Sequence, residues 1–245
     1  MAKIVNLARH QKVKKAIVEM IENGSISGNK LPSEDELSKL LGVSLSTLRE
    51  ALLVLKGEGI ISKRHGLGNF IHRSTLNTKM RIDLSTDFYS LLQDSGYEVK
   101  LTQSNFTVEK ATVKDRESLN LDPSDLVISY ERKFYADGKA AIVCYNRIAK
   151  KLFVKEPTNS VEEKNFAGFV WEYCQSEMAQ GIFEFIPAVT GKSEKELFGL
   201  ELGLPLTTWE EVFYSLGDEP ICLSYVLFNP KIVKMKMLWN WGYRE

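Results

Sequence analysis

Residues 41–52 read LGVSLSTLREAL, and this short stretch decides how the first part of the chain folds. Its leucines repeat at helical spacing, and Ser44 stands where the N-cap of a helix is expected. Exposed helices usually carry Glu, Lys, Gln or Ala, because these side chains lose little freedom in a helix. This helix instead shows Ser46, Thr47 and Arg49 in its first turns, and the residues around it explain why.

Two further helices are predicted before this stretch. The apolar residues between positions 13 and 21 repeat at helical spacing, which predicts a first helix ending near residues 23–24. Ser33 and Glu36 have the spacing of a capping box, so a short second helix is expected to begin after Ser33. Gly42 ends that helix and leaves a tight turn before the third one.

Two short strands are predicted after the third helix, over residues 60–64 and 69–72, around the loop 65–68. Helix, short helix, glycine turn, helix and β-ribbon is the element order of a winged helix-turn-helix. In that fold the third helix enters the major groove of DNA with its N-terminal end. Short hydroxyls let the backbone approach phosphates there, and Arg49 can reach a guanine. The alternative is a small helical domain whose third helix is merely solvated.

The charge distribution supports a polyanionic partner for the first part of the chain. The net charge is zero, but residues 1–73 hold 12 Lys and Arg against 7 Asp and Glu. All 3 histidines lie there, whereas 24 of the 25 aromatic residues lie in the acidic remainder. Such different compositions predict a DNA-binding domain over 1–73, a linker over 74–83 and a second domain over 84–245.

Residues 31–71, LPSEDELSKLLGVSLSTLREALLVLKGEGIISKRHGLGNFI, resemble the DNA-binding domain of GntR-type bacterial transcription regulators nearly end to end. The LPSE start, the GVS turn, the T-x-R-x-A-L helix and the G-x-G-x-F wing carry the likeness. The resemblance implies DNA contacts from seven residues: Ser33, Ser44, Ser46, Thr47, Arg49, His65 and Gly66. Lys63 and Arg64 of the wing are added to this set because of their positive charge. Asp35 and Leu45 stand where the family usually has Arg, so we expect an operator that differs from the family's usual one.

The acidic remainder is rich in strand patterns. Seven strands are predicted, at 98–108, Leu126–Ala136, 139–148, 181–189, 206–215, Pro220–Phe228 and 233–241. Helices are expected at 85–95, 114–121, 165–175 and 193–200, the last behind the capping pattern of Ser193 and Glu196. Residues 119–148 and 200–228 show the same order of predicted elements, an internal echo in the sequence: the end of a helix, a strand, a glycine turn and a returning strand. Two helix-plus-hairpin halves that build one antiparallel sheet are the economical interpretation, and the fold class is α+β.

The layout of residues 80–243 resembles the UTRA effector-binding domain of the HutC branch of GntR regulators, whose fold is similar to chorismate lyase. This resemblance implies a small-molecule site lined by Thr86, Asp87, Phe88, Arg132, Phe134, Cys144, Cys222 and Ser224. Phe134 replaces an arginine of the family pattern, and Cys144 and Cys222 replace glutamates. A site so depleted of anion-binding groups predicts a ligand with at most one anionic group, a large apolar part and an amine for Asp87.

The leading hypothesis is a ligand-responsive transcription regulator, a repressor that binds a near-palindromic DNA operator as a homodimer and is released by a small-molecule effector. An enzyme of chorismate-lyase-like fold is one alternative, but residues 74–245 contain no histidine and no glycine-rich phosphate loop. We therefore expect no catalytic residues, no metal and no cofactor. A redox sensor using Cys144 and Cys222 is the other alternative. The 3 cysteines show no CxxC spacing, and no apolar leader or membrane span is recognisable, which predicts a cytoplasmic protein.

Overall fold

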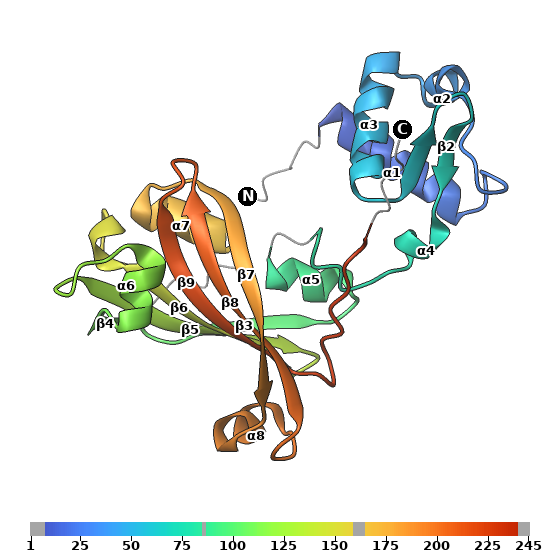
Figure 1. Cartoon of the computed structure of the whole chain (residues 1–245). Coiled ribbons are helices and arrows are strands. Elements are labelled where there is room, and N and C mark those ends of the chain that lie inside the picture. Colours follow the sequence, from blue (N-terminus) through green and yellow to red (C-terminus); the bar gives the residue numbers. More distant parts are fainter. Residues whose placement is uncertain (1–7, 85–86, 159–164, 240–245) are drawn as a thin grey trace. The chain divides into compact units, whose positions relative to one another are not determined.

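The computed structural model of the protein describes residues 8–84, 87–158 and 165–239 (Figure 1). The chain divides into two compact units. The first extends to Leu84 and also takes in the segment that begins at Lys236, and the second ends at Met235. Of the residues singled out above, Thr86 lies outside the described residues, as does the end of the expected strand 233–241.

The first unit, which we call the head, contains the five elements of a winged helix-turn-helix and one short helix. These are α1 (Arg9–Glu22), α2 (Glu34–Leu41), α3 (Leu45–Gly57), β1 (Ile61–Arg64), β2 (Gly68–Ile71) and α4 (Arg73–Leu76). The strands β1 and β2 pair antiparallel, with Lys63 opposite Asn69. The predicted winged helix-turn-helix is confirmed.

Local sequence signals produce the helices of the head. The capping box at the start of α2 is present, because Glu36 N–H donates to Ser33 Oγ and the backbone of Ser33 donates to the Glu36 carboxylate. Ser44 caps α3 by accepting a bond from Thr47 N–H at 3.2 Å. The apolar stripes of the three helices then form one core, whose fully buried members include Ile17, Ile21, Leu37, Leu48 and Leu55.

The segment 74–83, expected as a polar linker, packs on the head. α4 forms its first part, and Arg81 is only 6% exposed. The guanidinium of Arg81 donates to the carbonyl of Glu58 at 2.6 Å and pairs with Asp83. Polar composition therefore does not keep this segment in solvent, since its arginine binds a carbonyl at the end of α3.

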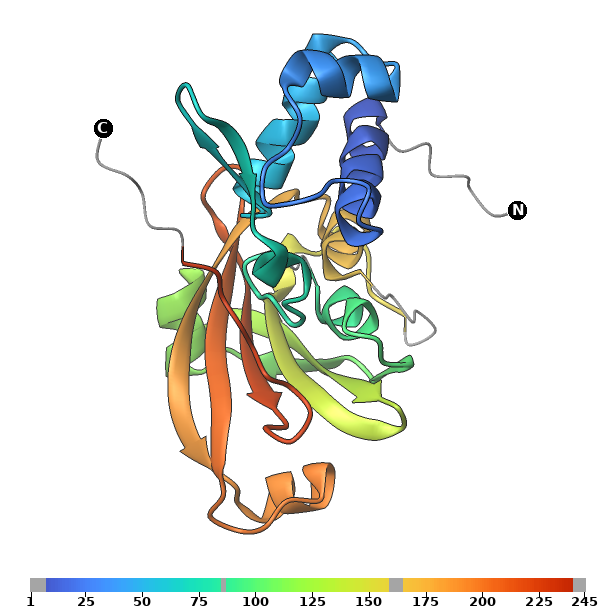
Figure 2. The same ribbon diagram turned by 90° about the vertical axis from the view of Figure 1, so that its right-hand side faces the viewer.

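The second unit is a seven-stranded antiparallel sheet with helices on both faces. Its elements are α5 (Phe88–Asp94), β3 (Val99–Gln103), β4 (Thr107–Lys110), α6 (Val113–Leu119), β5 (Leu126–Ala136), β6 (Lys139–Ala149), a 3₁₀ turn η1 (Lys150–Leu152), α7 (Phe166–Cys174), β7 (Met178–Val189), α8 (Lys192–Phe198), β8 (Pro205–Ser215) and β9 (Pro220–Phe228). The strand order is β3-β5-β6-β9-β8-β7, with β4 also paired to β5. The long strands of this sheet curve side by side in Figure 2.

The internal echo in the sequence corresponds to two structural halves. α6 with the hairpin β5–β6, and α8 with the hairpin β8–β9, meet where β6 pairs with β9 at the middle of the sheet. The prediction that two helix-plus-hairpin halves build one antiparallel sheet is confirmed.

Alternating side chains give the sheet two faces, which we define by residues on the central strands. The inner face bears Arg132 and Cys144, and the outer face bears Arg147 and Leu223. α5 and α7 cover the inner face through aromatic rings, whereas α6 and α8 pack on the outer face. A ligand held on the inner face would therefore lie between the sheet and the two helices α5 and α7.

Three expectations for this unit were wrong. The strand predicted at 98–108 is two strands, because Ser104 Oγ accepts a bond from Glu131 N–H and the chain bends there, so that the ring of Phe106 packs 4.8 Å from that of Tyr130. No strand follows residue 233 within the described residues, since the backbone of Lys236 bonds to Met80 and Ile82 of the head instead of joining the sheet.

The third wrong expectation concerns the start of α8. Its N-cap is Gly191, whose N–H donates to the Glu194 carboxylate at 2.8 Å, so the helix begins one residue earlier than predicted. A Cβ at this glycine would lie 2.8 Å from a Glu194 oxygen, so the Glu194 side chain would have to shift if another residue stood at position 191.

Candidate DNA-binding and effector sites

The start of α3 gathers three hydroxyls at one point. Ser44 Oγ lies 2.9 Å from Ser46 Oγ and 2.9 Å from Thr47 Oγ1, and the hydroxyl residues lie at or near the surface. Because Ser44 caps the helix, its hydroxyl is held beside the unpaired N–H groups of the first turn. This arrangement offers several hydrogen-bond donors to an anion such as a DNA phosphate.

Arg49 and Lys63 are brought together by Glu34, a residue that sequence reasoning missed. Arg49 Nε donates to Glu34 Oε2 at 2.7 Å, and Lys63 Nζ donates to Glu34 Oε1 at 2.9 Å. The hydrogen bond from Arg49, and then that from Lys63, lowers the pKa of Glu34. The LPSE motif includes Glu34, but only the fold shows that α2, α3 and the wing meet at its carboxylate.

The remaining residues of the predicted DNA-binding set surround this point. His65 and Gly66 are exposed at the tip of the wing, and Gly66 has a φ of +68°, which favours glycine. Ser33 lies at the N-terminus of α2, where its hydroxyl serves the capping box. Leu45 is 36% exposed at the first position of α3, so this departure from the family pattern places an apolar side chain on the same surface.

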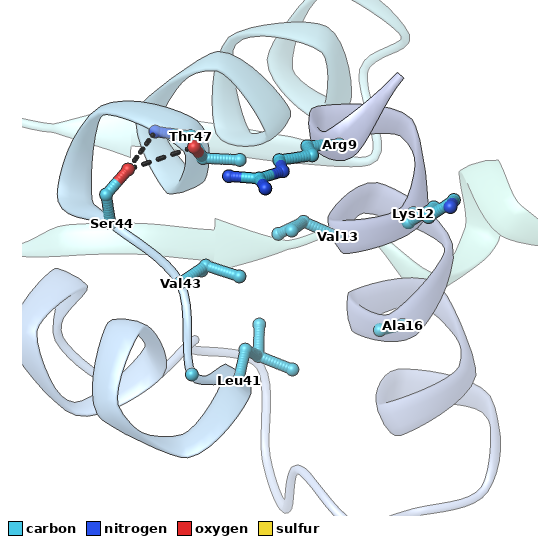
Figure 3. Close-up of a pocket in the computed structure, with 9 residues that line it drawn as sticks. Arg9, Lys12, Val13, Ala16, Leu41, Val43, Ser44 and Thr47 are labelled. Carbon is cyan, nitrogen blue, oxygen red and sulfur yellow. Dashed lines mark hydrogen bonds between the residues drawn. The ribbon is translucent and has the colours of Figure 1, made fainter. Parts of the chain in front are cut away.

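A groove of about 470 Å³ separates α1 from the start of α3. Figure 3 shows Arg9 and Lys12 of α1 on one side of it and Ser44 and Thr47 on the other. Both cations were missed by sequence reasoning, because on α1 alone they look like an ordinary solvated helix face. In the fold they add positive charge beside the hydroxyl cluster of α3.

The start of α5 holds Asp87 and Phe88, the two described residues that were predicted there. Asp87 is the N-cap of the helix, and its carboxylate accepts bonds from the backbone and hydroxyl of Ser90 at 2.8 and 3.0 Å. The ring of Phe88 lies 5.8 Å from Phe134 and 5.6 Å from Trp209, on the inner face of the sheet. Capping of α5 is therefore a structural role that by itself explains the carboxylate of Asp87.

Arg132 lies on the inner face in the middle of the predicted effector residues. It is 6% exposed, stands opposite Cys144 on β6, and its guanidinium carbon is 5.1 Å from the centre of the Phe134 ring. The same guanidinium carbon lies 5.9 Å from the centre of the Phe166 ring of α7. A buried cation among aromatic rings can bind one anionic or strongly polar group of a ligand.

A polar row crosses the inner face next to Arg132. The strand register places Tyr130, Asn146, Ser224 and Glu211 side by side on β5, β6, β9 and β8. Ser224 Oγ donates to Asn146 Oδ1 at 2.6 Å, while Asn146 Nδ2 has no hydrogen-bond partner in the described part of the chain. Buried donors are nearly always satisfied, so such an orphan group indicates a place for a ligand or an ordered water.

Glu211 gives this row a titratable group. Burial raises the pKa of Glu211 to about 7, and the side chain of Trp209 opposes this rise only in part. The position Gly181 on β7 makes room for it, since a Cβ there would lie 2.9 Å from Glu211 Oε1. A carboxyl that titrates near neutral pH is typical of binding and catalytic sites.

The structure therefore brings together most of the predicted effector residues and adds others. Phe88, Arg132, Phe134, Cys144, Cys222 and Ser224 lie on the inner face or on the helix that covers it. Asn146, Trp209 and Glu211 were missed. The alternation of TWEEVF on β8 places Trp209 and Glu211 on one side of a strand, but which side faces Ser224 depends on the pairing of β8 with β9.

The second arginine of β5–β6, Arg147, has a structural role on the outer face. Its guanidinium donates to Asp115 at 2.7 Å and to Glu109 at 2.8 Å, and Asp115 is fully buried. This ion pair ties α6 to the sheet and distinguishes Arg147 from Arg132.

The three cysteines are buried, reduced and separate. Cys144 stands opposite Val226 while Cys222 stands opposite Ile148. Four residues along a strand amount to roughly 13 Å, whereas a disulfide needs Cα atoms within about 7 Å. Burial also raises the pKa of Cys222 to about 12 and that of Cys144 further, which suppresses the reactive thiolate. This geometry argues against the redox-sensor alternative.

The described residues offer neither a metal site nor a membrane span. No group of three or more His, Cys, Asp or Glu could hold a metal ion, and no helix is long and apolar enough to cross a membrane.

A winged helix-turn-helix followed by an antiparallel sheet, whose inner face carries a buried arginine and a polar row among aromatic rings, defines a DNA-binding regulator with a ligand-binding domain. Comparison with known families agrees. The family described as bacterial regulatory proteins, gntR family, matches residues 9–71, and the UTRA domain matches residues 94–234. The chain belongs to the GntR family of transcription regulators that carry a UTRA domain.

Individual relatives are transcription regulators as well. TreR, an HTH-type transcriptional regulator of Bacillus subtilis, is 28% identical over 172 residues, which are 69% of this chain and 68% of TreR. A fatty acid metabolism regulator protein of Shewanella frigidimarina is 42% identical over 97 residues, 37% of this chain and 41% of that protein, so the match spans about two fifths of that relative.

Solved structures share the fold. YydK, a possible transcriptional regulator from Bacillus subtilis, superposes with a TM-score of 0.77 at 23% identity, covering 96% of this chain and 100% of YydK. PhnF from Mycobacterium smegmatis superposes with a TM-score of 0.59 at 16% identity, covering 93% of this chain and 99% of PhnF.

Proposed function

We propose that this regulator is a repressor of the HutC branch that binds a near-palindromic operator as a homodimer and is released by a small-molecule effector. The observation that carries this proposal is the joint surface of α3 and the wing, where Arg49, Lys63 and the hydroxyls of α3 are exposed together. Such a surface suits the major groove and its flanking phosphates.

Within this surface the residues have different tasks. Arg49 reads a guanine, because a guanidinium can donate to both O6 and N7. Ser44, Ser46 and Thr47 position the helix on a phosphate, while Arg64 and His65 lie along the backbone next to Gly66. Arg9 and Lys12 add a further phosphate contact from the groove beside α3.

The edge strand β7 supports a homodimer. Its apolar side chains Ile182, Phe185 and Val189 are 63%, 50% and 65% exposed, and a long apolar edge strand is normally covered in a soluble protein. A second copy of the chain is the partner expected of a protein that presents one reading helix and binds two operator half-sites. Light scattering in solution should then give about twice the mass of 27.8 kDa.

The effector site is the inner face of the sheet around Arg132. A ligand with one anionic group can pair with Arg132, and its apolar part can pack against Phe88 and Phe134. Any amine would meet a carboxyl, either Asp87 at the start of α5 or Glu211 in the polar row. Binding between the sheet and its covering helices would shift the spacing of the two heads in the dimer and release DNA.

The test begins with the operator, obtained by selecting the duplexes that the protein enriches from a random-sequence library. Arg49→Ala should weaken binding to the selected duplex by about 1–3 kcal/mol, because it removes a base contact. Lys56→Ala, which removes an exposed cation from the last turn of the same helix, is the control and should have a much smaller effect. Equal affinity of Arg49→Ala and the unmodified protein would refute the recognition-helix assignment.

The effector part is tested by calorimetric titration with sugar phosphates, amino-acid-like compounds and aromatic metabolites. Arg132→Ala should abolish the ligand response while leaving DNA affinity unchanged. Tight, Arg132-dependent binding of a hexose phosphate would show that the expectation of at most one anionic group, with a large apolar part, is wrong.

A further inference from the structure

The carboxylate of Glu34 joins three elements of the head that are distant in sequence. Glu34 is the first residue of α2, Arg49 lies on α3 and Lys63 lies on β1. One carboxylate oxygen accepts from Arg49 Nε at 2.7 Å and the other accepts from Lys63 Nζ at 2.9 Å. Each oxygen therefore holds one cation, and neither cation shares its oxygen with the other.

Stability of the fold does not explain this arrangement. The side chains of Arg49 and Lys63 are 64% and 58% exposed, and exposed ion pairs contribute little to folding. The helices α2 and α3 are already held together by the buried leucines of the core. The bonds that Glu34 accepts therefore mainly fix the directions of two long side chains, Arg49 and Lys63, that would otherwise rotate freely.

The geometry of the Arg49 guanidinium is the decisive feature. Its contact with Glu34 uses Nε, and among the described residues neither terminal nitrogen has a hydrogen-bond partner. These two nitrogens form the fork that donates to O6 and N7 of guanine. Lys63 likewise uses one of its three N–H groups on Glu34 and keeps the others for a phosphate.

We propose that Glu34 is a positioning residue that holds Arg49 and Lys63 in the orientation for DNA, and that it raises sequence discrimination while lowering affinity for DNA in general. The proposal rests on the proposed role of Arg49 in reading a base. A carboxylate on a DNA-facing surface repels phosphates, so its charge weakens binding to every sequence. Its hydrogen bond restricts Arg49 and so favours the one sequence that presents a guanine to it.

Glu34→Gln separates these two effects when it is compared with Asp35→Asn. Both variants remove one negative charge at neighbouring positions of the same helix turn. In the described structure Asp35 is exposed and makes no hydrogen bond to either cation. The probes are the duplex that the unmodified protein enriches from a random library and a duplex of the same composition in shuffled order, and fluorescence anisotropy gives both affinities.

Both variants should bind the shuffled duplex more tightly than the unmodified protein does. For Glu34→Gln, the ratio of the affinity for the selected duplex to the affinity for the shuffled duplex should in addition fall at least about fivefold. This is the discrimination that one bidentate base contact provides. Asp35→Asn should keep that ratio. Replacing the contacted guanine by 7-deazaguanine should weaken binding of the unmodified protein clearly and that of Glu34→Gln much less.

Glu34→Asp provides a second, independent measurement. It keeps the charge but shortens the side chain, so it should lose discrimination without gaining affinity for the shuffled duplex. Thermal unfolding of each variant checks that the head remains folded. If the unmodified protein enriches no sequence, the proposed DNA-reading function fails. If it discriminates and Glu34→Gln keeps the same ratio as Asp35→Asn, the role of Glu34 is refuted.

Discussion

Replacing Glu211 by Gln should make the unfolding of the effector domain much less sensitive to pH. Burial raises the pKa of Glu211 from 4.5 to about 7, so in the folded protein this carboxyl keeps its proton up to neutral pH. The unfolded chain loses the same proton near pH 4.5. Between these two values the unfolded state binds fewer protons than the folded state, and the free energy of unfolding falls as pH rises.

The magnitude follows from the size of the shift. One pKa unit corresponds to about 1.4 kcal/mol, so a rise from 4.5 to about 7 removes about 3 kcal/mol of stability above pH 7. Part of this loss has already occurred at pH 5, which leaves about 2.5 kcal/mol between pH 5 and pH 8. Glu211→Gln cannot ionise, so its stability should not show this decrease.

Urea denaturation at pH 5 and pH 8, followed by tryptophan fluorescence, measures the difference. Trp171 and Trp209 lie in the second unit, whereas Trp239 and Trp241 follow Lys236, where the segment assigned to the head begins. Both of the latter are therefore replaced by Phe in every protein compared, so that the signal reports the effector domain. Comparing each protein with itself at two pH values cancels any constant effect of the buried amide. Glu210→Gln is the matched control, because Glu210 lies one residue earlier, on the outer face, in an ion pair with Lys114. Equal pH dependence of Glu211→Gln and the unmodified protein would refute the reasoning.

Further predictions concern the wing, the caps and the thiols. Arg64→Ala should weaken binding to all DNA sequences alike and reduce the slope of log K against log salt by about one, as titration in KCl would show. Leu45→Arg should strengthen DNA binding in general, and weaker binding to the selected operator would instead reveal an apolar contact of Leu45 with a thymine methyl. Ser33→Ala should destabilise the head by about 1 kcal/mol in thermal unfolding, because it removes the cap of α2. The double variant Cys144→Ser, Cys222→Ser should still release the operator in response to the effector. If an oxidant releases the unmodified protein from the operator but not this variant, redox sensing is favoured instead.

The sequence predicts most of the elements of this protein because their signals are local. The capping box at Ser33, the cap at Ser44 and the glycine turns lie within a few residues of the helices that they begin or end. Period-two patterns predict the strands β5 and β9 with their observed ends. The echo between residues 119–148 and 200–228 even predicts that two hairpins share one sheet.

The two strand errors occur where a distant partner decides the local structure, whereas the start of α8 differs only by the choice of a local cap, Gly191 with Glu194. The strand expected over 98–108 is broken because Ser104 binds the backbone of β5, a strand that follows it by more than twenty residues. The chain beyond residue 233 has a strand-like composition, yet its backbone finds its partners at Met80 and Ile82. No window of the sequence contains both members of such a pair.

The candidate sites show the same division. Residue types and motif spacing are enough to single out Arg49 and Lys63 as candidate binding residues, and the resemblance to the UTRA domain singles out Arg132. Only the tertiary structure shows that Glu34 holds the first two, across separations of 15 and 29 residues, because these bonds depend on how α2, α3 and the wing pack. Likewise, Ser224 meets Asn146 across 78 residues, and Glu211 joins them through the register of β8 on β9. A shift of that register by one residue would turn Glu211 to the opposite face, so the sheet pairing decides whether this carboxyl belongs to the site.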